Sequence, residues 1–253
     1  ALHYTKDLVK DVQGEVLDLD WEAAITFVTN CQQRPESNKA EWVSKDAKDR
    51  GGFVYFPGKS MSTEESADGK VALRSYGSMS YAGLLSFVYA DMEKNDPRIV
   101  AVRDWLKKNY SVTQNPGMGP QGLFYYYNTM SKALNILDVD DFVLDDGKKV
   151  NWRDQLTKKL FDLQKPDGSW TNENGRWWEK DPVLTTCYSL LCLQRNPSQQ
   201  FHGNLNLKRS HLCRQKTFMK LSPKLIANSK FKEHLILIHS TWKPNFPCLG
   251  IKR

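Results

Sequence analysis

The spacing of hydrophobic residues predicts six helices within the first 194 residues. In each segment apolar or small side chains recur every three or four positions, which is the period of an amphipathic helix. The expected segments are 21–31, 76–92, 97–106, 122–137, a stretch ending at 163, and 182–193. A strand pattern is confined to one short hairpin expected around residues 142–150. The sequence therefore predicts an all-α fold.

Helix start signals support three of these segments. Asp96-Pro97 and Asp181-Pro182 each place a capping carboxylate before a proline at the first helical position. Either Asn151 or Asp154 is able to cap the helix that ends at Leu163. We therefore expect helices to begin at these points.

The six helices fall into three successive pairs. A more amphipathic helix comes first in each pair, around Trp21, Trp105 and Trp152. A loop with glycine and an aromatic residue follows, and then a more apolar helix. Helix-pair repeats bury their apolar faces by stacking on their neighbours. We expect the first helices to form an outer row and the second helices an inner row.

Charge divides the chain near residue 194. The net charge is +7, but residues 195–253 alone hold twelve Lys or Arg and one acid, whereas residues 1–194 hold 24 bases and 28 acids. We therefore expect a repeat domain at 1–194 that has no affinity for nucleic acid. The basic tail, 195–253, is predicted to be poorly ordered or not native to the repeat, although it has enough bases to contact phosphates or an anionic membrane surface.

The segment Gln164–Trp170 has the pattern Q-x-x-x-G-x-W. It resembles the signature of squalene and hopene cyclases and of prenyltransferase-type repeats. Residues 76–83, 115–119 and 176–182 look like bacterial squalene-cyclase-type repeat proteins of undefined activity. We expect the glutamine to cap a neighbouring helix end and the tryptophan to stack on it.

This resemblance covers roughly residues 4–194 and implies an α/α toroid, in which inner helices surround a cavity. Full toroids of the family have about twice as many helix pairs, so three pairs make an incomplete ring. Missing N-terminal repeats or a partner are then expected to cover the open flank. The resemblance also implies an apolar, isoprenoid ligand, with terpene cyclase activity as one hypothesis.

Cyclisation started by a proton needs a carboxylic acid in a dry cavity lined by aromatic rings. Asp138, Asp140 and Asp141 match the D-x-D-D acid motif of squalene-hopene cyclases. They also fit a solvated turn, because more acids, a glycine and two lysines follow. Asp138 and Asp140 are candidate catalytic acids on this basis, and Glu179 is a third candidate.

Glu179 follows two tryptophans, and a carboxyl group beside indole rings can have a raised pKa. The alternative is that Glu179 pairs with Arg176 or Lys180. Asp181 is expected to act only as a helix cap.

Aromatic residues gather at one end of the expected inner helices. We predict that they form the mouth of a ligand site, and the alternative is that they pack between helices. The rival hypothesis for function is a non-catalytic binding or scaffold protein that uses this rim for a protein or carbohydrate partner. The candidate ligand-binding residues are Tyr76, Tyr81, Tyr125, Tyr126, Trp177 and Trp178.

No metal or cofactor is predicted. Prenyltransferases hold zinc with Asp, Cys and His, and Asp181 and Cys187 are of the right type, but no histidine lies between His3 and His202. No glycine loop of the phosphate-binding kind follows a strand. Neither a targeting signal nor an apolar run of membrane-spanning length is visible, so the compartment is left open.

Overall fold

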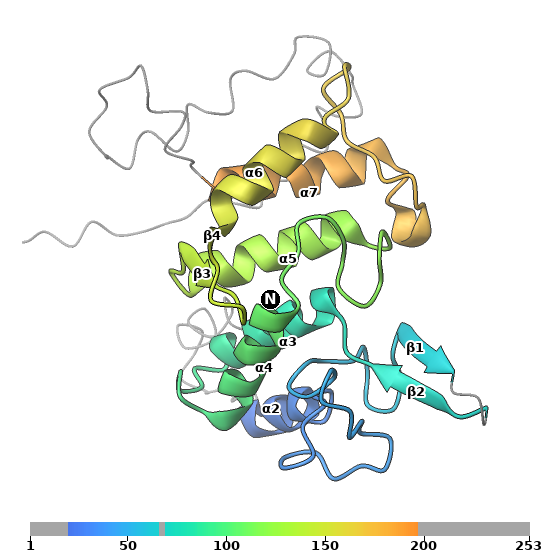
Figure 1. Cartoon of the computed structure of the whole chain (residues 1–253), viewed down its shortest axis with the longest axis vertical. Coiled ribbons are helices and arrows are strands. Elements are labelled where there is room, and N and C mark those ends of the chain that lie inside the picture. Colours follow the sequence, from blue (N-terminus) through green and yellow to red (C-terminus); the bar gives the residue numbers. More distant parts are fainter. Residues whose placement is uncertain (1–19, 66–68, 197–253) are drawn as a thin grey trace, which may run out of the picture.

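The computed structural model describes residues 20–65 and 69–196, and the predicted basic tail lies outside them beyond Asn196. All six expected helices are present within these residues (Figure 1). Their bounds are α2 Trp21–Thr29, α3 Gly77–Tyr89, α4 Pro97–Lys108, α5 Leu123–Ile136, α6 Trp152–Leu163 and α7 Pro182–Arg195.

The described fold is mostly helical, as expected, and it also contains two short antiparallel hairpins. The expected hairpin is formed by β3 Asp141–Val143 and β4 Lys149–Asn151. A second hairpin, β1 Ser62–Glu65 with β2 Val71–Arg74, was not predicted. Only Ser62 of β1 is buried, so this strand carries no alternation of apolar and polar residues.

Helix α5 lies at the centre of the helical part, in contact with α3 on one side and α7 on the other (Figure 1). Helices α2 and α4 pack against α3, and α6 packs against α7. Helices α3 and α5 are buried along most of their length, whereas α4 and α6 each bury a single stripe. The more apolar helices therefore form the inner row, and the amphipathic helices lie outside it.

The predicted helix caps are confirmed. The side chains of Asp96, Asn151 and Asp181 each accept a hydrogen bond from a backbone N–H two or three residues later, at 2.8, 3.0 and 2.8 Å. Each bond satisfies one of the N–H groups that lack a partner within the helix. These boundaries were predictable because both partners are close in sequence.

The Gln164–Trp170 segment closes on itself. Gln164 Nε2 donates to the carbonyl oxygen of Gly168 at 3.0 Å, so the expected cap on a neighbouring helix was wrong. Gly168 has φ +86°, which turns the chain back toward Gln164. Trp170 is 1% exposed, and its indole N–H donates to the carbonyl oxygen of Leu160 at 2.7 Å. The motif therefore anchors this loop to the end of α6.

Close packing of α3 depends on a glycine in its interior. Gly83 is buried, and a Cβ atom at this position would lie 2.5 Å from the ring of Phe53. Phe53 is 2% exposed, and its ring meets that of Phe87 edge to face at 5.6 Å between centroids. The Phe53 ring has no free space into which it can move.

Substituting Gly83→Ala is expected to lower the free energy of unfolding by up to about 2 kcal/mol. Alanine is the better helix former, by about 1 kcal/mol, but overpacking a tight core costs about 1–3 kcal/mol. Urea denaturation followed by circular dichroism measures the change. Ser86→Ala on the exposed side of the same helix is the control, and no loss is expected there. A more stable Gly83→Ala variant would contradict the packing argument.

Candidate functional site

The N-terminal ends of α3, α5 and α7 bring aromatic residues together. Tyr76 is the N-cap of α3, and Tyr125 lies in the first turn of α5. Trp177 and Trp178 belong to the short 3-10 turn η1, Arg176–Trp178, which precedes α7. The ring of Trp177 packs against Gly122 at the start of α5.

Three of the predicted ligand-binding tyrosines lie in the core. Tyr76, Tyr81 and Tyr126 are 2%, 1% and 0% exposed. The rings of Tyr81 and Tyr126 pack at 5.8 Å between centroids, and the hydroxyl of Tyr126 donates to the carbonyl oxygen of Ser111 at 2.8 Å. Burial raises the pKa of both Tyr81 and Tyr126 well above the ordinary value. For these three residues the structure favours packing between helices.

Other side chains at this end reach solvent, and we call them the aromatic rim. Trp178 is 81% exposed, Tyr55 is 54% exposed and Trp177 is 41% exposed. The rim consists of Tyr55, Met61, Tyr125, Arg176, Trp177, Trp178 and Tyr188.

Direct contacts connect five of the seven rim residues. The guanidinium of Arg176 stacks 4.5 Å from the ring centre of Trp177, and its Nη2 lies 3.9 Å from Sδ of Met61. The rings of Tyr125 and Tyr188 meet at 6.1 Å between centroids. These contacts link the rim residues in two groups, one of Met61, Arg176 and Trp177 and the other of Tyr125 and Tyr188. The rim residues come from the loop before β1, the turn η1 and helices α5 and α7.

The sequence predicted Tyr125 and the two tryptophans of the rim but did not predict Tyr55, Met61, Arg176 and Tyr188 as members. Tyr55 and Met61 lie in an irregular stretch that precedes an unpredicted hairpin, so no periodicity assigned a face to them. Arg176 was considered only as an ion-pair partner. The sequence did carry a signal for its stacking, because Arg176 directly precedes Trp177 and a guanidinium stacks readily on an indole ring.

The backbone of the rim is strained. Trp177 and Trp178 have φ values of +56° and +65°, in the left-handed region that bulky residues rarely adopt. Each such residue costs on the order of 1–3 kcal/mol and persists only where surrounding contacts hold it. Here the strain directs two large side chains outward rather than into the core.

Glu179 holds this strained turn in place. It is 0% exposed, and its Oε1 accepts from the backbone N–H of Tyr125 at 2.8 Å, while its Oε2 accepts from Nδ2 of Asn172 at 2.7 Å. The N-cap of α5 is Gly122, which has no side chain to accept these N–H groups. Glu179 therefore caps α5 from a distant loop, and the expected pairing with Arg176 or Lys180 was wrong.

Burial raises the pKa of Glu179, although hydrogen bonds from Asn172 and the start of α5 oppose the shift. A carboxyl group with a higher pKa in the folded than in the unfolded state binds protons more tightly when folded. Its contribution to stability is full below the unfolded pKa and is lost as pH rises through the folded pKa.

Replacing Glu179→Gln is expected to remove this pH dependence. As pH rises from below the ordinary glutamate range to neutrality, the free energy of unfolding of the wild type should fall relative to that of Glu179→Gln. Urea denaturation over a pH series measures it. The matched control is Glu173→Gln, the same substitution at an exposed residue of the same loop. A constant difference for both variants would contradict the raised pKa.

The other candidate acids lie at the opposite end of α5. Asp138 directly follows this helix, with φ +54°. Its backbone N–H donates to the carbonyl oxygen of Asn135, and that of Val139 donates to Leu134, which is the pattern of a Schellman helix end. A helix of 14 residues spans roughly 20 Å at about 1.5 Å per residue, so Asp138 lies far from the aromatic rim.

The D-x-D-D acids are also exposed to water. Asp138 and Asp140 are exposed, and Asp140 accepts a hydrogen bond from Nε of Arg153 at 2.7 Å. Asp141 pairs with Lys149 at 2.8 Å, which lowers its pKa. An acid that protonates an alkene needs a dry site, and this placement gives no support to that role.

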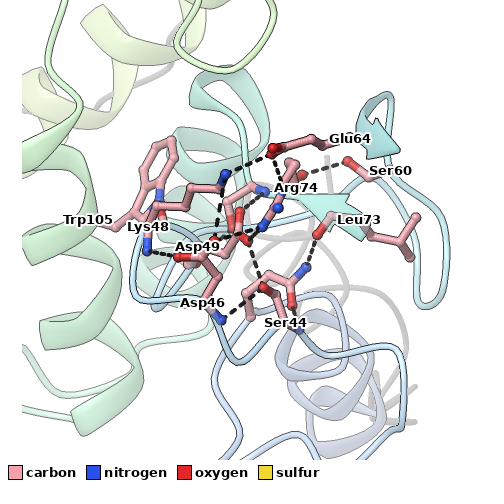
Figure 2. A network of polar contacts seen from close by, with 11 residues as sticks. Ser44, Asp46, Lys48, Asp49, Ser60, Glu64, Leu73, Arg74 and Trp105 are labelled. Atoms are coloured by element: carbon pink, nitrogen blue, oxygen red, sulfur yellow. Dashed lines mark hydrogen bonds and ion pairs between the residues drawn. The ribbon is translucent and has the colours of Figure 1, made fainter. Parts of the chain in front are cut away.

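A dense polar network surrounds Asp49 on the loop before β1 (Figure 2). Oδ2 of Asp49 accepts from the hydroxyl of Ser44 at 2.7 Å and from Nη1 of Arg74 at 2.6 Å. Its Oδ1 accepts from the backbone N–H of Ser75 at 2.9 Å, and the indole of Trp105 donates to the carbonyl oxygen of Lys48 at 2.8 Å. Because these groups satisfy one another, the network fixes the loop to β2 and α4 and has no open position for a substrate.

Asp49→Ala is expected to lower the free energy of unfolding by about 3 kcal/mol, because it leaves the hydroxyl of Ser44 and the backbone N–H of Ser75 without this acceptor and removes the buried carboxylate nearest to Arg74, which keeps only the more exposed Asp46 and Glu64. Thermal and urea denaturation measure the loss. Lys48→Ala, next to it in the sequence and half exposed, is the control, with stability close to that of wild type. Equal losses in both variants would show that Asp49 is no more important than a surface charge.

Metal and membrane sites are not apparent in the described part of the chain. Residues 20–65 and 69–196 contain no group of three or more His, Cys, Asp or Glu side chains arranged to hold a metal ion. No helix among these residues combines the length and the apolar character needed to cross a bilayer.

Comparisons with known proteins give no match: the chain fits no family model, and no curated protein and no solved structure is significantly similar to it.

Proposed function

We propose that this chain is an incomplete α/α toroid that acts as a protein-binding module through its aromatic rim. The row α3, α5, α7 with amphipathic helices outside it supports the toroid. Helix α7 is the last helix of this row among the described residues, and it buries only four residues, compared with nine in α5, which has an equal length. Further repeats or a partner beside α7 would cover that flank.

The observation that carries the proposal is the exposure of Trp178 on a strained turn. An indole that is 81% exposed contributes little to the core, yet the turn that presents it is fastened by the buried Glu179. Trp177 and Trp178 are exposed, and no candidate acid is aimed into a cavity beside them. This arrangement is the one expected of a binding protein. The rim is therefore suited to recognition rather than to catalysis.

A protein is the partner that fits the composition of the rim. Tyr, Trp, Met and Arg are enriched in protein interfaces, whereas Lys, Glu, Asp and Ser are depleted. All seven rim residues belong to the enriched types, and Trp, Tyr and Arg dominate interface hot spots. A carbohydrate would need polar side chains between the rings, and Arg176, the one charged group of the rim, already contacts Gln121 and Trp177.

Proton-initiated isoprenoid cyclisation has weaker support. Asp138 and Asp140 are exposed at the far end of α5. Glu179 is buried near the rim, but both of its oxygens accept hydrogen bonds from Tyr125 and Asn172. A carboxylate held in this way caps a helix and has no free position at which to meet an alkene.

Trp178→Ala is expected to weaken partner binding strongly and to leave the fold intact. The full chain is immobilised and exposed to an extract of its source cells, retained proteins are identified, and one is purified for affinity measurement. Loss of a hot-spot tryptophan of about 2 kcal/mol weakens binding by about 30-fold. Phe161→Ala, which truncates a 44% exposed aromatic residue of α6, is the control and should change the affinity less than twofold.

Two results would count against a protein partner. One is a retained protein that binds Trp178→Ala and wild type equally well. The other is a change of tryptophan fluorescence on adding farnesol or oligosaccharides that Trp178→Ala removes, with no protein retained. The second result would favour the small-molecule or carbohydrate partner that the sequence also left open.

A further inference from the structure

A separate pocket lies at the other end of α5, away from the aromatic rim. Its volume is about 280 Å³, and it is enclosed by α3, α4, the end of α5 and β3. This volume is at the lower limit of small-molecule sites, which span about 300–1,000 Å³. The interior is aliphatic, formed by Leu84, Leu106, Leu134, Leu137 and Val139, and the exposed Val143 lies at the mouth.

The mouth of this pocket is positively charged. Arg103 and Lys107, one turn apart on α4, both line it. Within residues 20–65 and 69–196 no hydrogen bond or ion pair involves the guanidinium of Arg103, which is exposed. The one acid that lines the pocket, Asp141, lies 2.8 Å from the ammonium group of Lys149, which offsets its charge.

An aliphatic interior below an unpaired guanidinium is complementary to a molecule with an apolar chain and an anionic head. The chain would be buried among the leucines and Val139, and a carboxylate would accept hydrogen bonds from Arg103. Nζ of Lys107 lies 3.4 Å from Oδ1 of Asp104, which partly offsets its positive charge. Lys107 therefore attracts an anion at this mouth less strongly than Arg103 does. A neutral or cationic head would gain nothing from these groups.

We propose that this pocket binds an anionic amphiphile, specifically a medium-chain carboxylate. The small volume favours a short acyl chain over a branched or polycyclic molecule. The site is independent of the proposed function, because no residue of the aromatic rim lines it.

Isothermal titration calorimetry on the full chain tests the proposal, with decanoate, decanol and decyltrimethylammonium as probes below their micelle concentrations. Decanoate is expected to bind saturably and at least tenfold more tightly than the other two, because hydrogen bonds to a charged group are worth about this factor. Absence of saturable decanoate binding, or equal affinity for decanol, would overturn the proposal.

Charge variants test the role of the mouth. Arg103→Gln should reduce the preference for decanoate over decanol by about tenfold. Lys108→Gln, on the same helix but not lining the pocket, should keep it. Equal behaviour of the two variants would show that the overall charge of α4, and not the pocket, attracts the anion.

Blocking variants test the location. Val143 is 53% exposed, so Val143→Trp is expected to obstruct the mouth and weaken decanoate binding at least tenfold without unfolding the chain. Val100→Trp on the outside of α4, where Val100 is 41% exposed, is the matched control and should bind as wild type does. Circular dichroism verifies that both are folded. Loss of decanoate binding in Trp178→Ala would place the ligand at the rim and overturn the proposal.

Discussion

The burial of α5 between α3 and α7 is the constraint on which the described structure depends. A buried helix start leaves backbone N–H groups away from water, and each must find an acceptor. Gly122 precedes α5 and offers none. The carboxylate of Glu179 supplies the acceptor, and in doing so it fixes the loop that carries Trp177 and Trp178. The rim is thus a consequence of how a central helix is capped.

The two ends of α5 differ in the residues that surround them. At its start, a buried carboxylate and a strained turn support exposed aromatic side chains. At its end, Asp138 adopts the left-handed conformation of a Schellman motif and the chain continues into β3. Acids that look like a catalytic motif in the sequence therefore serve a helix terminus and a surface hairpin. The spacing of acidic residues alone does not distinguish these uses.

The exposed aromatic residues form the rim, and a buried polar network holds the loop that contributes to it. Asp49, Arg74 and their partners hold an irregular loop that carries Tyr55 to the rim. That loop also buries Val43, Phe53 and Val54, so hydrogen bonds and packing together determine its path. The aromatic rim is thereby assembled from segments that no single helix pair contains.

The sequence by itself determined the six helices, the capping role of Asp96 and Asp181 and the β3–β4 hairpin, because those signals lie within a few residues of one another. Only the tertiary structure decided that Tyr81 and Tyr126 pack in the core while Trp178 faces water. Their side-chain directions depend on which helices lie alongside. The capping of α5 by Glu179 could not be predicted from the local sequence either. Glu179 lies 54 residues after Tyr125, and a contact between distant segments produces no periodic pattern in either of them.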